Sequence, residues 1–216
     1  MKEKSQNTVS IIGGADGPTS VFIAGRSGKK PLKVRIRNCI YKYKQGRAEK
    51  KIVPGAHSLE EVVAYAKDNY DVMEMDGSRK QYVEQRKNLK ENLVIRYKPE
   101  LSGDMKELSK PDIYNKETLR KFFDQIQERS EMIAEIPDSE IRMDFHIYEI
   151  KIGDNYLEME IDYNWNIFTV SYCGEKKAMK QLKKIARDLY IYYGVSEEDI
   201  RKRTERYSAL LAILSV

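Results

Sequence analysis

Three strand patterns follow one another closely between residues 141 and 173, and they decide the fold class. Their sequences are IRMDFHIYEIKI (Ile141–Ile152), YLEMEIDY (Tyr156–Tyr163) and IFTVSYC (Ile167–Cys173). The two connections between them, GDN and NWN, consist largely of residues that favour tight turns. Because short turns join antiparallel neighbours, the stretch predicts a three-stranded antiparallel meander with one face covered.

The middle strand of this meander alternates between apolar and acidic residues. Its apolar residues are Leu157, Met159, Ile161 and Tyr163, and its acidic residues are Glu158, Glu160 and Asp162. Successive side chains of a strand point to opposite faces, so we expect a buried apolar face and a solvated acidic one. Alternate residues stand about 7 Å apart along a strand, too far for adjacent carboxylates to share one small cation easily.

Helical patterns precede and follow the meander. Asn115 can cap a helix that ends near residue 134, and Gly174 leads into another that Gly194 stops. Ser196 can cap a last helix, whose apolar C-terminal half closes the core or forms a homodimer contact. The predicted fold is α+β: an N-terminal glycine loop and basic strand region with a helix, then a helix, the meander and two C-terminal helices.

Shorter signals lie before Asn115. Ser58 and Glu61 have the spacing of a capping box, which predicts a helix that ends near residue 70. A second short helix is expected over residues 79–89 and a strand over residues 92–97.

Residues 98–114 contain two prolines and a glycine and make the best linker candidate in the chain. A division there gives two folded regions after an N-terminal segment. The predicted parts are residues 1–30 as a flexible tail and loop, 31–98 as a small α+β region, and 112–216 as an α-βββ-αα region, with one continuous domain over 31–216 as the alternative.

Residues 31–44 show a period of two, which predicts a long strand with one buried face. A short strand over residues 50–53 is expected to continue it. The face expected to be buried holds Leu32, Val34, Ile36 and Ile40, and the exposed face holds Lys33, Arg35, Arg37, Cys39, Tyr41 and Tyr43. Cations mixed with aromatic rings are typical of single-stranded nucleic-acid platforms. Nucleic-acid binding is therefore an alternative function, with Lys33, Arg35, Arg37, Tyr41 and Tyr43 as the face for an anionic partner. The favoured interpretation is a solvated sheet face whose Lys and Arg stems cover apolar neighbours.

Charge is distributed unevenly along the chain. The 216 residues carry a net charge of +5, with 41% hydrophobic and 34% charged residues. Residues 1–51 hold 13 Lys and Arg against three acidic residues, so the N-terminal quarter is strongly basic and the remainder mildly acidic. Such asymmetry can attract nucleic acid, an anionic membrane surface or an acidic protein patch.

Cysteine use and apolar run lengths indicate the compartment. Cys39 and Cys173 are the only cysteines, and they lie far apart outside any CxxC pattern, which favours reduced thiols in the cytoplasm. No apolar run of signal-peptide length follows the N-terminal lysines, and none reaches the roughly 20 residues of a membrane span.

Catalytic motifs are missing from the sequence. His57 and His146 are the only histidines, so a zinc site built from three or more histidines is excluded. Cys173 and His146 are a nucleophile and base by type, but the meander places them on outer strands with the middle strand between them. We therefore predict no catalytic residues and favour a binding or interaction protein over an enzyme.

The N-terminal segment IIGGADGPT (residues 11–19) is compositionally unusual. The carboxylate of Asp16 and the hydroxyl of Thr19 are hard oxygen ligands, and Gly13, Gly14 and Gly17 allow the backbone to approach a small ligand closely. The alternative interpretation is an ordinary turn, because Asp-Gly between two apolar runs is a turn signal.

This segment closely resembles the signature of the membrane-embedded β subunit of the sodium-ion-translocating decarboxylases, which act on oxaloacetate, methylmalonyl-CoA and glutaconyl-CoA. The resemblance covers less than a tenth of the chain. It implies that Asp16 takes part in binding sodium and in coupling sodium passage to decarboxylation. Na⁺ is the only ion expected. It also makes membrane decarboxylase subunits candidate partners. The chain lacks the many apolar spans of such a subunit, so a borrowed loop or an accessory chain fits the sequence better than a transporter.

Overall fold

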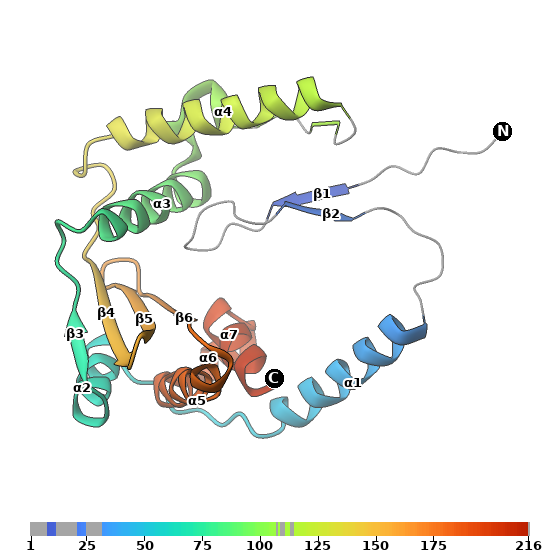
Figure 1. Ribbon diagram of the computed structural model, residues 1–216, viewed down its shortest axis with the longest axis vertical. Coiled ribbons are helices and arrows are strands. Elements are labelled where there is room, and N and C mark those ends of the chain that lie inside the picture. Colours follow the sequence, from blue (N-terminus) through green and yellow to red (C-terminus); the bar gives the residue numbers. More distant parts are fainter. Residues whose placement is uncertain are drawn as a thin grey trace. The chain divides into compact units, whose positions relative to one another are not determined.

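The computed structural model describes residues 8–11, 21–24, 32–106, 108, 111–112 and 115–215, and it confirms the α+β class. Helices and antiparallel strands follow one another along the chain (Figure 1). The elements are β1 (Thr8–Ile11), β2 (Val21–Ala24), α1 (Leu32–Glu49), α2 (Leu59–Asn69), β3 (Val72–Glu74), α3 (Lys80–Tyr97), η1 (Pro99–Lys106), α4 (Lys116–Glu135), β4 (Phe145–Ile152), β5 (Asn155–Asp162), β6 (Ile167–Cys173), α5 (Lys176–Tyr193), α6 (Glu197–Lys202) and α7 (Glu205–Ser215).

The chain forms two compact units, each built from two stretches of sequence. The first unit combines Met1–Ser27 with Asp76–Phe145, and the second combines Gly28–Met75 with His146–Val216. Strands β3 and β4 pair with each other although the helices of the first unit separate them in sequence. The stretch that we predicted as a linker, residues 98–114, lies inside the first unit.

The sheet of the second unit has the strand order β3-β4-β5-β6 with antiparallel pairing. Strands β5 and β6 pair with Met159 opposite Val170, and β3 and β4 pair with Met73 opposite Glu149. The predicted meander β4-β5-β6 is therefore confirmed. Strand β3 was not predicted, because three residues carry no periodic pattern and the strand exists through its pairing with β4.

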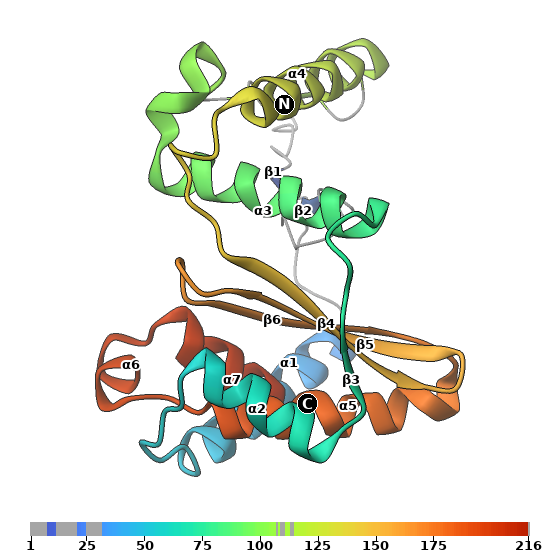
Figure 2. The same ribbon diagram turned by 90° about the vertical axis from the view of Figure 1, so that its left-hand side faces the viewer.

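Helices α2 and α5 cover one face of this sheet (Figure 2). The apolar residues of β5 lie in the resulting core, where Leu157, Met159 and Ile161 are all fully buried. Val62 of α2 and Leu182 of α5 are also fully buried there. The alternation in β5 thus predicted its core face correctly, and every member of this core belongs to the second unit.

Helix α2 begins with the capping box that the sequence predicted. The Ser58 hydroxyl accepts a hydrogen bond from the Glu61 N–H at 3.2 Å, and the Glu61 carboxylate accepts one from the Ser58 N–H at 2.7 Å. Each residue satisfies a backbone donor that has no partner within the helix.

The prediction for the segment after α2 was wrong in part. The helix expected over residues 79–89 and the strand expected over 92–97 are one helix, α3. Leu93 and Val94 are buried in it, and α3 packs against α4 and η1. A short apolar run fits a buried strand or a buried helix turn equally well, so the tertiary neighbours decided between them.

Helix α1 stands where a basic strand was predicted, so this prediction was wrong. Residues 32–49 form one continuous α-helix, and residues 50–53 form a turn and a loop in place of the second predicted strand. Apolar residues at positions 32, 36 and 40 fit a helical repeat of four as well as a strand repeat of two. Lys and Arg are good helix formers, and contact with α7 supports the helix.

The C-terminal region contains three helices where two were predicted. Gly194 ends α5 as expected, with a φ of 62° and its N–H donated to the Tyr190 carbonyl. The predicted last helix is interrupted at Arg203, whose φ of 50° is left-handed. The interruption separates α6 from α7 and lets α7 pack against both α5 and α1.

Candidate interaction surface

Helix α1 carries a row of exposed apolar side chains. Leu32, Ile36, Ile40 and Tyr43 are 70%, 52%, 53% and 67% exposed, respectively. Their spacing of four, four and three residues places them on one face of the helix over about 16 Å. We call these four residues the apolar stripe. Large apolar groups scattered singly over a surface are ordinary, but a contiguous row marks an interaction site.

Six cations of α1 border the apolar stripe, and all of them are exposed. With about 100° per residue, Arg35 and Lys42 lie on one border, and Lys33, Arg37 and Lys44 lie beyond the other. The sixth cation, Arg47, lies near the C-terminal end of the stripe. No acidic residue occurs between Leu32 and Ala48. Within the described part of the chain, none of the six cations forms an ion pair.

The C-terminal end of α1 is attached to the rest of the second unit. Ala48 is buried, and one carboxylate oxygen of Glu49 accepts hydrogen bonds from Tyr207 (3.0 Å) and Arg203 (2.8 Å). Burial raises the pKa of Tyr207, and its bond to Glu49 adds to the shift. Ala48 lies about 80° around the helix axis from Ile40 and about 160° from Leu32, to one side of the apolar stripe. The contact with α7 therefore leaves the stripe exposed.

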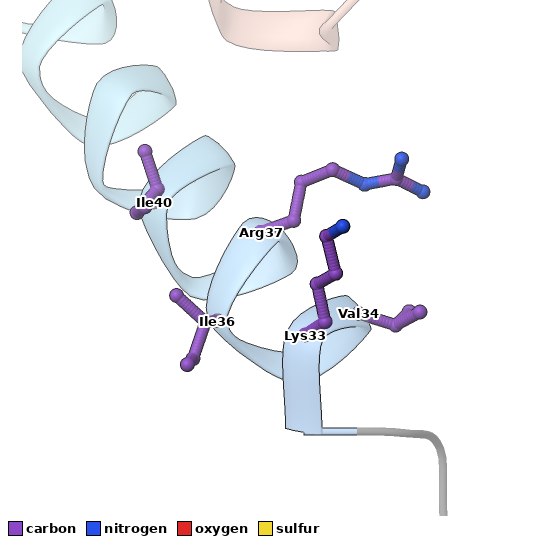
Figure 3. A pocket seen from close by; sticks show the side chains of 5 residues that line it. All are labelled: Lys33, Val34, Ile36, Arg37 and Ile40. Atoms are coloured by element: carbon purple, nitrogen blue, oxygen red, sulfur yellow. The ribbon is translucent and has the colours of Figure 1, made fainter.

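A hollow of about 350 Å³ opens on the N-terminal half of α1 (Figure 3). Among the described residues it is lined by Lys33, Val34, Ile36, Arg37 and Ile40. Ile36 and Ile40 point to one side of the helix, and Val34 and Arg37 point to the other. An apolar group and an anionic group of one partner would both find matching side chains here.

The five residues predicted as an anionic-partner face lie on this same helix but not on one face. Tyr41 and Tyr43 stand about 160° apart around the helix axis. The Tyr41 hydroxyl accepts a hydrogen bond from Gln45 at 3.2 Å, whereas Tyr43 belongs to the apolar stripe. In a strand, Tyr41 and Tyr43 would lie on the same face, but in the helix they do not. The two rings therefore form no common platform for stacked bases. Lys33, Arg35 and Arg37 remain exposed cations.

Three of the four stripe residues were predicted to lie on a buried face, and this was wrong, whereas Tyr43 was predicted to be exposed. Leu32, Ile36 and Ile40 were expected in the core, but the side of α1 that packs is the one carrying Ala48. The spacing of Leu32, Ile36, Ile40 and Tyr43, with cations on both sides, is the signal that could have revealed a basic helix with an apolar stripe.

The predicted ligand loop, with Gly13, Gly14, Asp16, Gly17 and Thr19, lies outside the described residues. The strands on either side of it are described. β1 and β2 pair antiparallel, with Ile11 opposite Val21. Residues 12–20 therefore connect two paired strands.

The acidic row of β5 is buried, which contradicts the predicted solvated face. Glu158, Glu160 and Asp162 are at most 3% exposed. Strands β4 and β6 flank β5 on both sides, and Glu160 stands opposite Thr169. Alternation distinguishes the two faces of a strand but does not reveal whether the second face is covered.

The buried acidic row is not arranged as a metal site. Asp162 accepts a hydrogen bond from the Trp165 N–H at 2.9 Å, and the residues Glu158 and Glu160 also take part in polar or electrostatic interactions. Within the described ranges, no group of three or more His, Cys, Asp or Glu side chains is placed to hold a metal ion.

The two histidines have structural neighbours. His146 Nδ1 lies 2.7 Å from Glu74 Oε1, and strand β5 separates it from the strand that carries Cys173. Cys173 is exposed and stands opposite Tyr156, next to the β4–β5 turn and far along the sheet from His146. The structure therefore does not bring His146 and Cys173 together. His57 stacks on Tyr192 with 4.1 Å between ring centroids.

A tyrosine–aspartate cluster that the sequence did not indicate joins α2 to α5. The hydroxyls of Tyr65 and Tyr70 donate to the same oxygen of Asp188 at 2.8 and 2.6 Å. The bond to Asp188 and burial raise the pKa of Tyr65, and burial followed by the bond to Asp188 raises the pKa of Tyr70. Both hydroxyls stay protonated at neutral pH, and the cluster links the two helices.

No protein-family model, no curated protein and no solved structure matches this chain. Among the helices of the described residues, none combines the length and the apolar character needed to cross a membrane. Function is therefore inferred from the α1 surface and the N-terminal motif.

Proposed function

We propose that this protein is a non-catalytic binding protein that uses α1 to engage an anionic partner. The observation that carries the proposal is the exposed apolar stripe on a helix whose first 17 residues contain six cations and no acid. Exposed apolar area is unfavourable in water and is relieved when a partner covers it. Unpaired cations favour a partner of opposite charge and speed its association.

The location that we propose is the cytoplasm. Cys39 and Cys173 are both exposed and unpaired. Exposed free thiols suit a reducing compartment, because an oxidising one favours disulfide formation.

Heparin, a soluble polyanion, tests the proposed function. A Lys33→Gln/Arg37→Gln/Lys44→Gln variant of the full chain should elute from a heparin column at clearly lower salt than the wild type, because three contacts with the polyanion are lost. The matched control is Lys180→Gln/Lys183→Gln/Lys184→Gln, which removes three exposed lysines from α5. Equal elution shifts for the two variants, or none for the α1 variant, would contradict α1 as the binding surface.

A second candidate site is the GGADGPT segment, as a cation or protein-partner site centred on Asp16. Its resemblance to the decarboxylase β subunit supports it, as does its position between the paired strands β1 and β2. On this hypothesis the chain is an accessory component of a sodium-translocating decarboxylase. Co-purification with decarboxylase subunits from detergent-solubilised membranes should occur with the wild type and be lost with Asp16→Asn. Equal recovery by both forms would contradict a role for Asp16.

A further inference from the structure

The chemistry of the apolar stripe selects among anionic partners. Leu32, Ile36 and Ile40 are aliphatic and about half or more exposed. A nucleic acid offers phosphates to the cations, but its bases are bound mainly by aromatic stacking, for which these side chains are unsuited. A partner that satisfies the whole surface must present an apolar region immediately beside its negative charges.

Charge also argues against a second copy of this chain as the occupant. Two α1 helices packed stripe to stripe would place the bordering cations of each helix, such as Lys33 and Arg35, beside those of the other. No acidic residue between Leu32 and Ala48 is present to neutralise them. Like charges brought together at an interface oppose association.

The attachment of α1 further restricts the geometry of the partner. A protein groove that receives an amphipathic helix must be shaped to fit its apolar face. At the C-terminal end of α1, Ala48 is buried and Glu49 is held by Tyr207 and Arg203, so this end of the helix is not free to turn toward a partner. A flat partner needs only the free face, and the stripe presents that face over about 16 Å.

We propose that α1 docks in the plane of an anionic membrane surface, an inference that rests on the proposed function and names its partner. Leu32, Ile36, Ile40 and Tyr43 enter the boundary between headgroups and acyl chains, and the bordering cations contact anionic headgroups. An apolar face with Lys and Arg beside it can lie in the plane of a membrane surface, with its charges at the level of the headgroups. The long stems of Lys and Arg let their charges reach the headgroups while the apolar stripe is buried.

Binding is expected to depend on both components of the surface. Each cation near an anionic surface contributes about fivefold to partitioning, so affinity should rise with phosphatidylserine content and fall with salt. A single helix with four apolar side chains provides reversible binding and not permanent insertion.

Co-sedimentation of the full chain with vesicles tests the proposal. We expect binding to vesicles that contain phosphatidylserine and little binding to vesicles of phosphatidylcholine alone. The variant Ile36→Gln/Ile40→Gln should lower partitioning at least about tenfold, because two aliphatic side chains no longer enter the membrane. The matched control is Val83→Gln/Ile191→Gln, which replaces residues that are 53% and 50% exposed on α3 and α5. This control should bind like the wild type.

The two native cysteines allow a direct measurement of docking. Cys39 lies at the edge of the apolar stripe, one helical turn from Ile36 and Tyr43, and Cys173 lies on β6; both are exposed. An environment-sensitive dye on Cys39, in a Cys173→Ser chain, should shift to the blue on addition of phosphatidylserine vesicles. The same dye on Cys173, in a Cys39→Ser chain, should not shift.

The outcomes separate this inference from the proposed function. Retention on heparin without vesicle binding would overturn membrane docking and leave an acidic macromolecule as the partner of α1. Wild-type binding by Ile36→Gln/Ile40→Gln, or equal dye shifts at both cysteines, would also overturn docking through the stripe, because adsorption would then depend on charge alone. If the wild-type chain binds neither heparin nor vesicles that contain phosphatidylserine, both the proposed function and the membrane partner would be overturned.

Discussion

At the scale of single residues, Gly194 occupies a position that no other residue fits. Its φ of 62° lies in the left-handed region, and a Cβ there would stand 1.8 Å from the Gly55 carbonyl oxygen. Neighbouring backbone groups hold the two segments together, because the Gly55 N–H donates to the Val195 carbonyl at 2.9 Å. A side chain at this position requires the backbone to move.

Gly194→Ala should therefore destabilise the protein by at least about 2 kcal/mol, through the clash and the unfavourable φ. Urea unfolding monitored by circular dichroism measures this as a lower midpoint. Gly46→Ala is the matched control, because no atom lies within 4 Å of its added Cβ and it sits inside α1. It should be neutral or stabilise α1 by up to about 1 kcal/mol. Equal midpoints for the two variants would contradict the clash.

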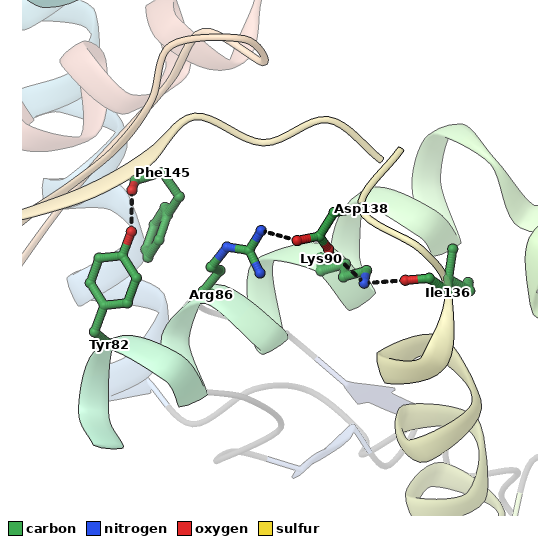
Figure 4. Close-up of polar contacts among 6 residues, drawn as sticks. All are labelled: Tyr82, Arg86, Lys90, Ile136, Asp138 and Phe145. Carbon is green, nitrogen blue, oxygen red and sulfur yellow. Dashed lines mark hydrogen bonds and ion pairs between the residues drawn. The ribbon is translucent and has the colours of Figure 1, made fainter. Parts of the chain in front are cut away.

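At the scale of elements, a polar clamp attaches α3 to the segment that follows α4 (Figure 4). The buried Lys90 ammonium donates to the Ile136 carbonyl at 2.5 Å and to Asp138 at 3.0 Å, and Arg86 donates to Asp138 at 2.6 Å. Hydrogen bonds from Arg86 and then Lys90 hold the pKa of Asp138 below its usual value. A carboxylate with a lowered pKa stabilises the fold above its unfolded pKa of about 3.9, and this contribution is lost as the pH falls through the folded pKa.

Asp138→Asn should cost about 1 kcal/mol at pH 7, a modest figure because the carboxylate is half exposed and screened by solvent. The difference from the wild type should shrink as the pH falls below about 4, since the wild-type carboxyl is then protonated too. Urea midpoints measured across this pH range test the prediction. Glu117→Gln, in an exposed pair with Lys121, is the control and should change stability by no more than about 0.5 kcal/mol. A difference that does not vary with pH would contradict the clamp.

At the scale of the whole molecule, the second unit holds a core of its own. Every member of the cluster formed by α2, the sheet and α5 belongs to that unit. The two residues of the second unit that flank the inserted stretch Asp76–Phe145 lie close together, because the Met75 N–H donates to the Ile147 carbonyl at 2.8 Å. A β-hairpin loop of about four residues can span such a gap.

A chain in which a four-residue Gly/Asn/Ser loop replaces residues 76–145 should therefore fold cooperatively. Circular dichroism and amide NMR would show retained strand and helix, with a single unfolding transition in urea. Leu182→Ala, in the fully buried core of the second unit, should cost about 3 kcal/mol in both the full and the shortened chain. Failure of the shortened chain to unfold cooperatively would show that the second unit needs the first.

Features that depend on neighbouring residues were predicted correctly from the sequence, and features that depend on distant residues were not. The capping box at Ser58 and the helix stop at Gly194 depend on atoms within a few residues, and both were confirmed. The clamp at Lys90 and Asp138 joins residues 48 positions apart, and no rule of residue spacing predicts such a contact. The burial of Asp162 likewise depends on what covers the second face of the sheet.

The candidate surface was predicted in composition but not in geometry. The residues of interest, from Lys33 to Tyr43, were identified from their cations and rings, yet the predicted strand placed Leu32 and Ile36 in the core. Period two and period four coincide at positions 32, 36 and 40, so the apolar pattern alone could not distinguish strand from helix. The deciding contacts come from α7, more than 150 residues later in the chain.

The sequence by itself determined the α+β class, the meander, the capping of α2 and the end of α5, because hydrogen-bond periodicity and turn chemistry act over a few residues. It also determined that the N-terminal quarter is basic. Only the tertiary structure decided that residues 32–49 are a helix, that β3 completes the sheet and that the acidic face of β5 is buried. The physical reason is that burial is a property of a residue's neighbours, and here those neighbours come from distant parts of the chain.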